Sequence, residues 1–297
     1  MLRTLISAGL LGTALLTPAV ASAQSAAISS DDPSVRINVA GRQRMLSQRM
    51  TKAACLMAQD IDATAAYDQL TQAYELFTRT DVALRDGDPS MRLGPETHSD
   101  VISALQRVDP HWATYKIIAE KGIDEAYVEY ADLAVMDETG LDVLKFMNIA
   151  VYKTARAWAE GSENLDLGLA ITIDIAGRQR MLTQLAVKNV CLMREAEDPT
   201  VYADSLANAV ELFDSSLLAL QDGFGDIGVI APPTTEISQT LREVSELWQP
   251  IRVVMDRAAD GDPISDRELS SLARDTELLL QKMNEAVGLY AASTSAS

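Results

Sequence analysis

The sequence predicts an all-α protein made of two tandem four-helix up-down bundles related by internal duplication. Leu, Ala, Met, Glu, Gln and Arg dominate the composition and favour helix, while aromatic residues are only 5% of the chain. Apolar residues recur at three-to-four spacing over most of the sequence, which is the period of an amphipathic helix. The block VAGRQRML at Val39–Leu46 returns as IAGRQRML at Ile175–Leu182, 136 residues later.

The duplication extends well beyond this block. Ile37–Met57 and Ile173–Met193 agree at 13 of 21 positions, and the same offset pairs Met147-Asn148 with Met283-Asn284. Each copy is about 125–135 residues long, which is an ordinary domain size. Because two copies are too few for a solenoid, we expect two separate domains.

The N-terminus has the features of a secretory signal peptide. Arg3 precedes an apolar run and the small residues Ala21-Ser22-Ala23 follow it, so we expect cleavage near Ala23/Gln24 and export to the periplasm. No segment reaches the length of a spanning helix, so we expect no membrane insertion of the mature chain. The expected organisation is a signal peptide (1–23), a flexible segment (24–33), a first domain (34–160), a linker (161–168), a second domain (169–292) and a disordered tail (293–297).

Turn signals divide each domain into four helices. Asp86-Gly87-Asp88-Pro89 is a strong turn signal. Gly122 and Asp124 read as a helix C-cap and the next N-cap, and Pro110 is expected to kink or split the third helix. The expected helices are 34–59, 63–86, 95–121 and 124–160, then 169–196, 199–222, 233–259 and 265–292.

The chain is strongly acidic, with 25 Lys+Arg against 43 Asp+Glu and a formal net charge of −18. This charge argues against nucleic acid and anionic membranes as partners. A small anion could bind only where arginines gather locally.

The first helix of each copy places unusual residues on one narrow stripe. Arg44 lies one turn after Gly41 on that stripe, and Arg180 follows Gly177 in the second copy. Glycine permits close approach of a backbone or a ligand, and the guanidinium is a planar donor suited to an oxyanion. Gln48 and Gln184 come next along the stripe, so the candidate ligand-binding residues are Gly41, Arg44, Gln48, Gly177, Arg180 and Gln184.

A buried arginine requires an anionic partner, since an unpaired buried charge is costly. Spacing alone favours a salt bridge within each bundle over an anionic solute for Arg44 and Arg180. Three other arginines point away from the stripe, and we expect them to pair with acidic side chains of neighbouring helices: Arg42, Arg49 and Arg178.

Other duplicated residues have more than one interpretation. Cys55 and Cys191 are interpreted first as small buried hydrophobes; a disulfide around a pseudo-two-fold axis and a soft-metal site are the alternatives. The asparagines Asn148 and Asn284 are expected to fix helix register, with a polar contact near the first-helix site as the alternative. Tryptophans Trp112 and Trp248 are expected to pack in the core or between helices.

Enzymatic chemistry is not indicated. His98 and His111 are the only histidines and neither is duplicated. The serines lack the His/Asp set needed for nucleophilic catalysis, and no metal-binding or phosphate-binding motif is present. We therefore expect no enzyme activity, no cofactor and no metal.

The run Ile37–Met50 (INVAGRQRMLSQRM) resembles the opening helix of the PilJ-type N-terminal domain, the sensing domain of type IV pili methyl-accepting chemotaxis transducers. It is also similar to the ligand box of nitrate/nitrite sensor kinases of the NarX and NarQ type. The resemblance implies a four-helix bundle that dimerises through its first helix. It further implies nitrate or nitrite at the dimer axis, held by arginines at Arg44 and Arg180 and by backbone near Gly41 and Gly177.

The chain departs from that pattern in three ways. Asp174 stands where the first copy has Asn38, Leu185 replaces the arginine found at Arg49, and no transmembrane or output module is recognised. We therefore hypothesise an intramolecular pseudo-dimer in which both arginines converge on one anion.

The predicted function is that of a soluble periplasmic protein that binds a nitrate- or nitrite-like oxyanion and signals to a separate membrane receptor or transporter. The alternative is a non-catalytic periplasmic adaptor whose arginines form internal salt bridges. Pairing of two chains into a homodimer is left open.

Overall fold

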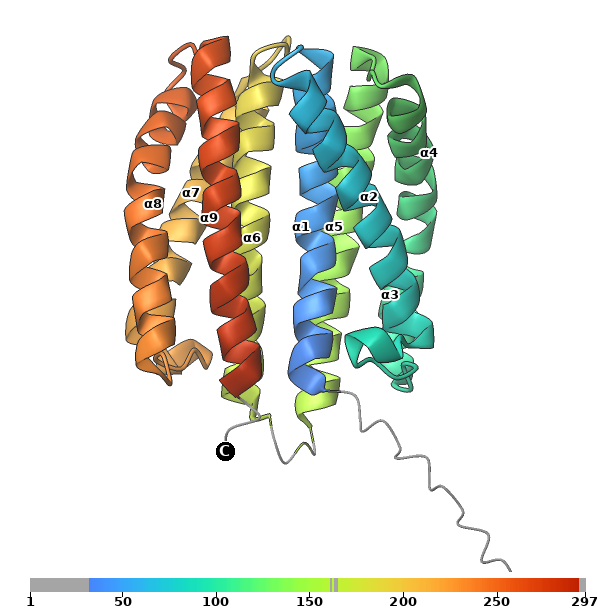
Figure 1. The fold of residues 1–297 in the computed structure, drawn as a ribbon, viewed down its shortest axis with the longest axis vertical. Helices are drawn as coiled ribbons and strands as arrows, with labels where there is room; N and C mark the ends of the chain where they lie inside the picture. The colour runs from blue at the N-terminus through green and yellow to red at the C-terminus, as the bar shows by residue number, and fades with distance from the viewer. Residues whose placement is uncertain (1–31, 161, 163–164, 294–297) are drawn as a thin grey trace, which may run out of the picture.

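A computed structural model describes residues 32–160, 162 and 165–293, and it places two helical bundles side by side (Figure 1). The predicted fold class is confirmed, since this part of the chain contains helices, turns and two isolated β-bridges but no strand. The predicted signal peptide, nearly all of the N-terminal segment and most of the tail lie outside the described residues. The helices are α1 (Pro33–Ala58), α2 (Ala63–Asp86), α3 (Ser99–Gln106), α4 (Asp109–Glu125) and α5 (Tyr130–Ala159), then α6 (Leu167–Met193), α7 (Thr200–Asp222), α8 (Thr235–Ala259) and α9 (Asp266–Ala292).

Helices α1 and α6 lie next to each other at the centre of the molecule, with α2–α5 on one side and α7–α9 on the other (Figure 1). Each central helix is buried around nearly its whole circumference, because one face packs in its own bundle and the other against the second copy. The two first helices are therefore paired within one chain.

Helix α1 begins after Asp32, whose carboxylate accepts hydrogen bonds from the backbone N–H groups of Ser34 and Val35.

The third helix of the first domain is split, as Pro110 suggested. Helix α3 ends at Gln106 and α4 begins at Asp109, with Pro110 in its first turn, where a missing N–H costs nothing. The corresponding helix α8 is continuous and contains Pro250 in its interior.

The predicted break at Gly122 and Asp124 is wrong. Helix α4 runs through both residues to Glu125, and the chain turns at Ala126, which has φ +50°. A Cβ built on Gly122 would lie 2.8 Å from the Val128 side chain, so this glycine makes room for close packing and does not cap a helix.

Both tryptophans pack as expected. Trp112 stacks on Phe77 and Trp248 packs at a tilt against Phe213, and the ring centroids of each pair are 4.0 Å apart. The two domains therefore repeat the same aromatic contact, which fixes the third-helix segment of each bundle against the second helix.

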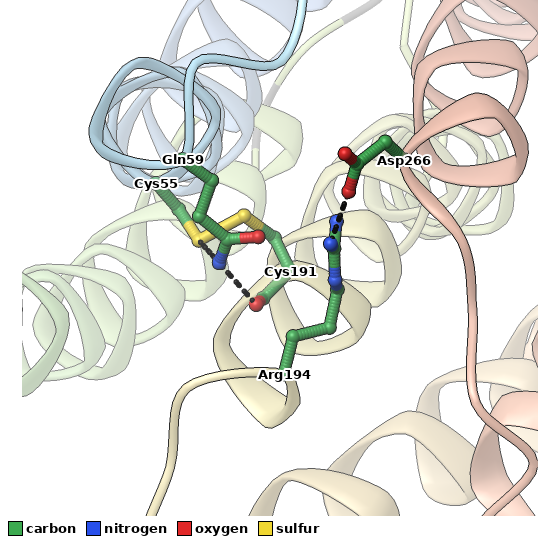
Figure 2. The surroundings of a disulfide bond; sticks show 5 residues. All are labelled: Cys55, Gln59, Cys191, Arg194 and Asp266. Carbon is green, nitrogen blue, oxygen red and sulfur yellow. Dashed lines mark hydrogen bonds and ion pairs between the residues drawn. A yellow bond between two sulfur atoms is a disulfide. The ribbon is translucent and has the colours of Figure 1, made fainter.

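A disulfide joins Cys55 of α1 to Cys191 of α6 (Figure 2). The interpretation of these cysteines as unbonded hydrophobes is wrong, because the pairing of the two helices brings equivalent positions face to face, with Cα atoms 6.2 Å apart. The amide of Gln59 lies against the bond and donates to the Cys191 carbonyl at 2.8 Å.

Buried ion pairs also cross between the bundles. Lys52 of α1 lies 2.7 Å from Glu277 of α9, and Lys188 of α6, the duplicate of Lys52, pairs with Asp137 of α5. Burial by itself would raise the pKa of Glu277, but the positive charges of Lys52 and Arg49 lower it. Each bundle thus supplies a lysine that the other neutralises.

Candidate ligand-binding site between the two first helices

The structure brings Arg44 and Arg180 together at the α1–α6 interface. Each is 1% exposed. A Cβ built on Gly41 would lie 3.2 Å from Nη2 of Arg44 and 3.6 Å from Nη2 of Arg180, and one built on Gly177 would lie 3.6 Å and 3.1 Å from the same two atoms. The glycines therefore leave the space into which both guanidiniums extend.

Equivalent asparagines, Asn148 of α5 and Asn284 of α9, hold the two guanidiniums in the same way. Arg44 Nη1 donates to Oδ1 of Asn148 at 3.2 Å, and Arg180 Nη1 donates to Oδ1 of Asn284 at 3.0 Å. The polar-contact interpretation of these asparagines is confirmed, so α5 and α9, the last helices of the two domains, each orient an arginine of their own domain.

The other terminal nitrogen, Nη2, of each guanidinium contacts the opposite copy, and the two copies differ in this contact. Arg44 Nη2 lies 2.6 Å from the Asp174 carboxylate and donates to the Asp174 carbonyl at 3.2 Å. Arg180 Nη2 donates to the carbonyl of Asn38, the counterpart of Asp174, at 3.4 Å. Within the described ranges no carboxylate lies within ion-pair distance of Arg180, so only Arg44 has a counter-charge. The predicted salt bridge within each bundle is therefore wrong for both arginines: Arg44 pairs across the two bundles, and Arg180 has no ion pair with a described residue.

Burial disfavours the charged form of both arginines. It lowers the pKa of Arg44, and the nearby Asp174 carboxylate opposes this effect. Burial also lowers the pKa of Arg180, where the positive charges of Arg42 and Arg44 act in the same direction. Guanidinium stays protonated at neutral pH, so Arg180 carries an uncompensated buried charge.

The arginines outside the stripe have mixed outcomes. Arg49 pairs with Glu277 of neighbouring helix α9 at 2.7 Å, as predicted. Arg178 pairs at 3.5 Å with Asp174 on its own helix, which contradicts the prediction of a partner on another helix.

The prediction for Arg42 is wrong, because it makes no ion pair with any residue that the structure describes. It lies beside Arg180 of the other copy, whose pKa it lowers. A helical wheel of one helix places Arg42 and Arg44 on opposite sides, but a second parallel helix brings Arg42 next to the second copy's arginine.

A cavity of about 330 Å³ opens beside Arg180 between α1, α2, α6 and α9. Its polar lining includes Asn38, Arg42, Arg49, Arg180 and Asn284, and none of its lining residues is acidic. The chain has a net charge of −18, so a cavity lined by three arginines and no acidic residue is a local exception. Such a local concentration of positive charge is what anion binding requires.

The two candidate glutamines lie deeper along the interface. Both are fully buried; Gln48 Nε2 donates to the Gly140 carbonyl at 3.1 Å, and Gln184 Nε2 lies 3.5 Å from the Thr183 hydroxyl. Neither lines the cavity, so their role in ligand binding stays a prediction.

The histidines lie away from the paired arginines. His98 contacts Glu96 at 2.9 Å and His111 contacts Asp142 at 3.2 Å. Over the described part of the chain, no group of three or more His, Cys, Asp or Glu is placed to hold a metal ion.

Two helical bundles paired through their first helices, with buried arginines converging on the contact, define a module suited to ligand sensing. Residues 27–132 and 166–272 each match the family described as type IV pili methyl-accepting chemotaxis transducer N-term (PilJ). These segments cover more than half of the chain, and the protein belongs to the PilJ family.

A curated relative agrees with this assignment. The chain is 29% identical over 122 residues to the methyl-accepting chemotaxis protein McpN of Pseudomonas aeruginosa. The match covers 41% of this chain and 22% of that protein, so the chain spans about a fifth of its relative. The family is one of non-catalytic sensory domains that typically face the periplasm or the cell exterior, which indicates a role in sensing or signalling. Within the described residues, no helix has both the length and the apolarity required to cross a membrane.

Proposed function

We propose that this protein binds a small oxyanion of the nitrate or nitrite type between α1 and α6, and that occupancy of the site is its signal. The observation that supports the proposal is the convergence of two buried guanidiniums, of which one, Arg180, contacts only neutral acceptors among the residues that the structure describes. An anion in the adjoining cavity would supply the missing charge.

The expected affinity is moderate. Charge-assisted hydrogen bonds contribute about 1.5–3 kcal/mol each. Two of them total about 3–6 kcal/mol, which corresponds to dissociation constants between roughly tens of micromolar and several millimolar, and desolvation of the anion and of the cavity weakens binding further.

The adaptor alternative has one observation in its favour, the ion pair between Arg44 and Asp174. It accounts for one arginine of the pair and leaves the charge of Arg180 unexplained. The sensory proposal accounts for both, because the ligand would act on the unneutralised side.

Location and partner follow as further parts of the proposal. The predicted signal peptide and the usual location of the family support the periplasm. A separate membrane receptor or transporter would receive the signal, as suggested by similarity to a chemotaxis protein. A homodimer through the first helix is not proposed, because α1 is already covered by α6.

Calorimetric titration of the mature chain with nitrate and nitrite tests the proposal. The wild type should release or absorb heat with at least one anion, and Arg180→Gln should bind at least tenfold more weakly. Arg274→Gln, which removes an exposed arginine paired with Asp62, is the matched control and should leave affinity unchanged. No heat from the wild type with either anion would favour the adaptor alternative.

A further inference from the structure

The two sides of the arginine pair are chemically different, although the duplication makes them geometrically equivalent. On one side Asp174 lies between two arginines, 2.6 Å from Arg44 and 3.5 Å from Arg178. On the other side the equivalent arginines are Arg180 and Arg42, and the residue equivalent to Asp174 is the neutral Asn38.

On the Asn38 side the two arginines have no counter-charge among the described residues, whereas Asp174 supplies one on the other side. Arg42 makes no ion pair and Arg180 no contact with a carboxylate in the part of the chain described, and the buried Oδ1 of Asn38 accepts no hydrogen bond there. The cavity of about 330 Å³ opens on this side, with Asn38, Arg42, Arg180 and Asn284 in its wall. Buried positive charge beside a cavity favours an anionic partner, and none of the described residues supplies one here.

We propose that the site is one-sided: a single planar monoanion binds in this cavity and bridges Arg180 and Arg42, as the Asp174 carboxylate bridges Arg44 and Arg178. Asp174 is thus a tethered anion that permanently fills one half of a duplicated site, and the ligand fills the other half. This inference rests on the proposed function and adds to it the position, the stoichiometry and the ligand chemistry of the site.

The tethered carboxylate indicates the chemical class of the ligand. A planar monoanion that presents two oxygens along one edge matches the guanidinium fork. Nitrate, nitrite and the carboxylate of a short organic acid share this chemistry. The cavity also has an apolar wall of Met45, Leu46 and Leu76, against which an organic acid could pack and a bare inorganic anion could not.

The duplication supplies a matched pair of variants, Arg42→Gln and Arg178→Gln, which remove the same side chain from equivalent positions. Each would be titrated calorimetrically, as the full mature chain, with nitrate, nitrite, acetate and butyrate. The wild type should bind one anion per chain. Arg42→Gln should weaken binding about tenfold, and Arg178→Gln should change it less than twofold. Tighter binding of butyrate than of nitrate and nitrite would identify the ligand as an organic acid, and the reverse order would identify it as an inorganic anion.

A second variant tests the tethered carboxylate independently of the ligand's identity. Asn38→Asp places a carboxylate beside Arg180, so it should raise the thermal midpoint and abolish anion binding. Equal losses in Arg42→Gln and Arg178→Gln, or undiminished binding by Asn38→Asp, would overturn the one-sided site while leaving the proposed function intact. No binding by the wild type would overturn the proposed function itself.

Discussion

The two ends of the α1–α6 interface use charge in opposite ways. Toward the C-terminal ends of the two helices, Cys55 and Cys191 are bonded, and the buried Lys52 and Lys188 each have a carboxylate from the opposite bundle. Toward the N-terminal ends lie Arg42, Arg44, Arg178 and Arg180, and Asp174 is the one carboxylate paired with any of these four among the described residues. Under the proposed function, the C-terminal end holds the two domains together and the N-terminal end receives the anion.

Breaking a buried ion pair at the C-terminal end should have the largest effect. Asp137→Ala leaves the charge of Lys188 buried and unpaired, which costs about 3–5 kcal/mol of unfolding free energy. Asp174→Asn at the other end should cost less, about 1.5–3 kcal/mol for the lost charge-assisted contact, because the backbone carbonyl of residue 174 and Oδ1 of Asn148 still accept from Arg44. Chemical denaturation monitored by circular dichroism measures both.

A double variant, Asp137→Leu with Lys188→Met, is the control for this comparison. It removes both charges and should recover most of the lost stability. Equal losses for Asp137→Ala and Asp174→Asn would contradict the division of roles between the two ends.

Removal of the disulfide should have the next largest effect. The double variant Cys55→Ala, Cys191→Ala should lose about 2–4 kcal/mol of unfolding free energy, because the oxidised chain is constrained when unfolded. Its affinity for nitrate or butyrate should change less than threefold, since the ion pairs still hold the helices together. A loss of anion binding in a folded double variant would show that the two ends are coupled.

Substitution at the glycines should have the smallest effect on stability and a clear effect on binding. A Cβ at Gly41 would lie 3.2 Å from Nη2 of Arg44, the far end of a flexible side chain that can move. Helix propensity gains about 0.5–1 kcal/mol on replacing glycine by alanine, so Gly41→Ala should keep the thermal midpoint near that of the wild type.

The displaced guanidinium should nevertheless lower anion affinity several-fold, as measured by calorimetry. Gly288→Ala, where a Cβ would meet nothing within 4 Å, is the control and should leave affinity unchanged. If Gly41→Ala unfolded the protein, the glycine would serve packing and not the ligand.

The sequence was sufficient to predict the fold, because the 136-residue offset and the helical period report independently on the same architecture. Local boundaries were harder. Pro110 acts through its own backbone, so its effect on the helix is predictable from the sequence, whereas Gly122 leaves room for the Val128 side chain, a contact that forms only when the following turn folds. A capping glycine and a packing glycine look alike in sequence.

The site was partly predictable for a similar reason. The stripe on the first helix identified Arg44, Arg180 and both glycines, since their spacing is a property of one helix. The proximity of Arg42 to Arg180, and the effect of having Asn38 where the second copy has Asp174, depend on how the second helix packs. The periodicity of a single helix cannot predict either. The same holds for the disulfide.

The pairing of α1 with α6 inside one chain has a consequence for symmetry. In a homodimer every substitution appears twice, so both half-sites of a two-fold interface must stay identical. A tandem chain removes this constraint: residue 38 and residue 174 can differ, and one half-site can carry its own carboxylate while the other stays open. The interface also persists at any dilution, because its two halves cannot diffuse apart.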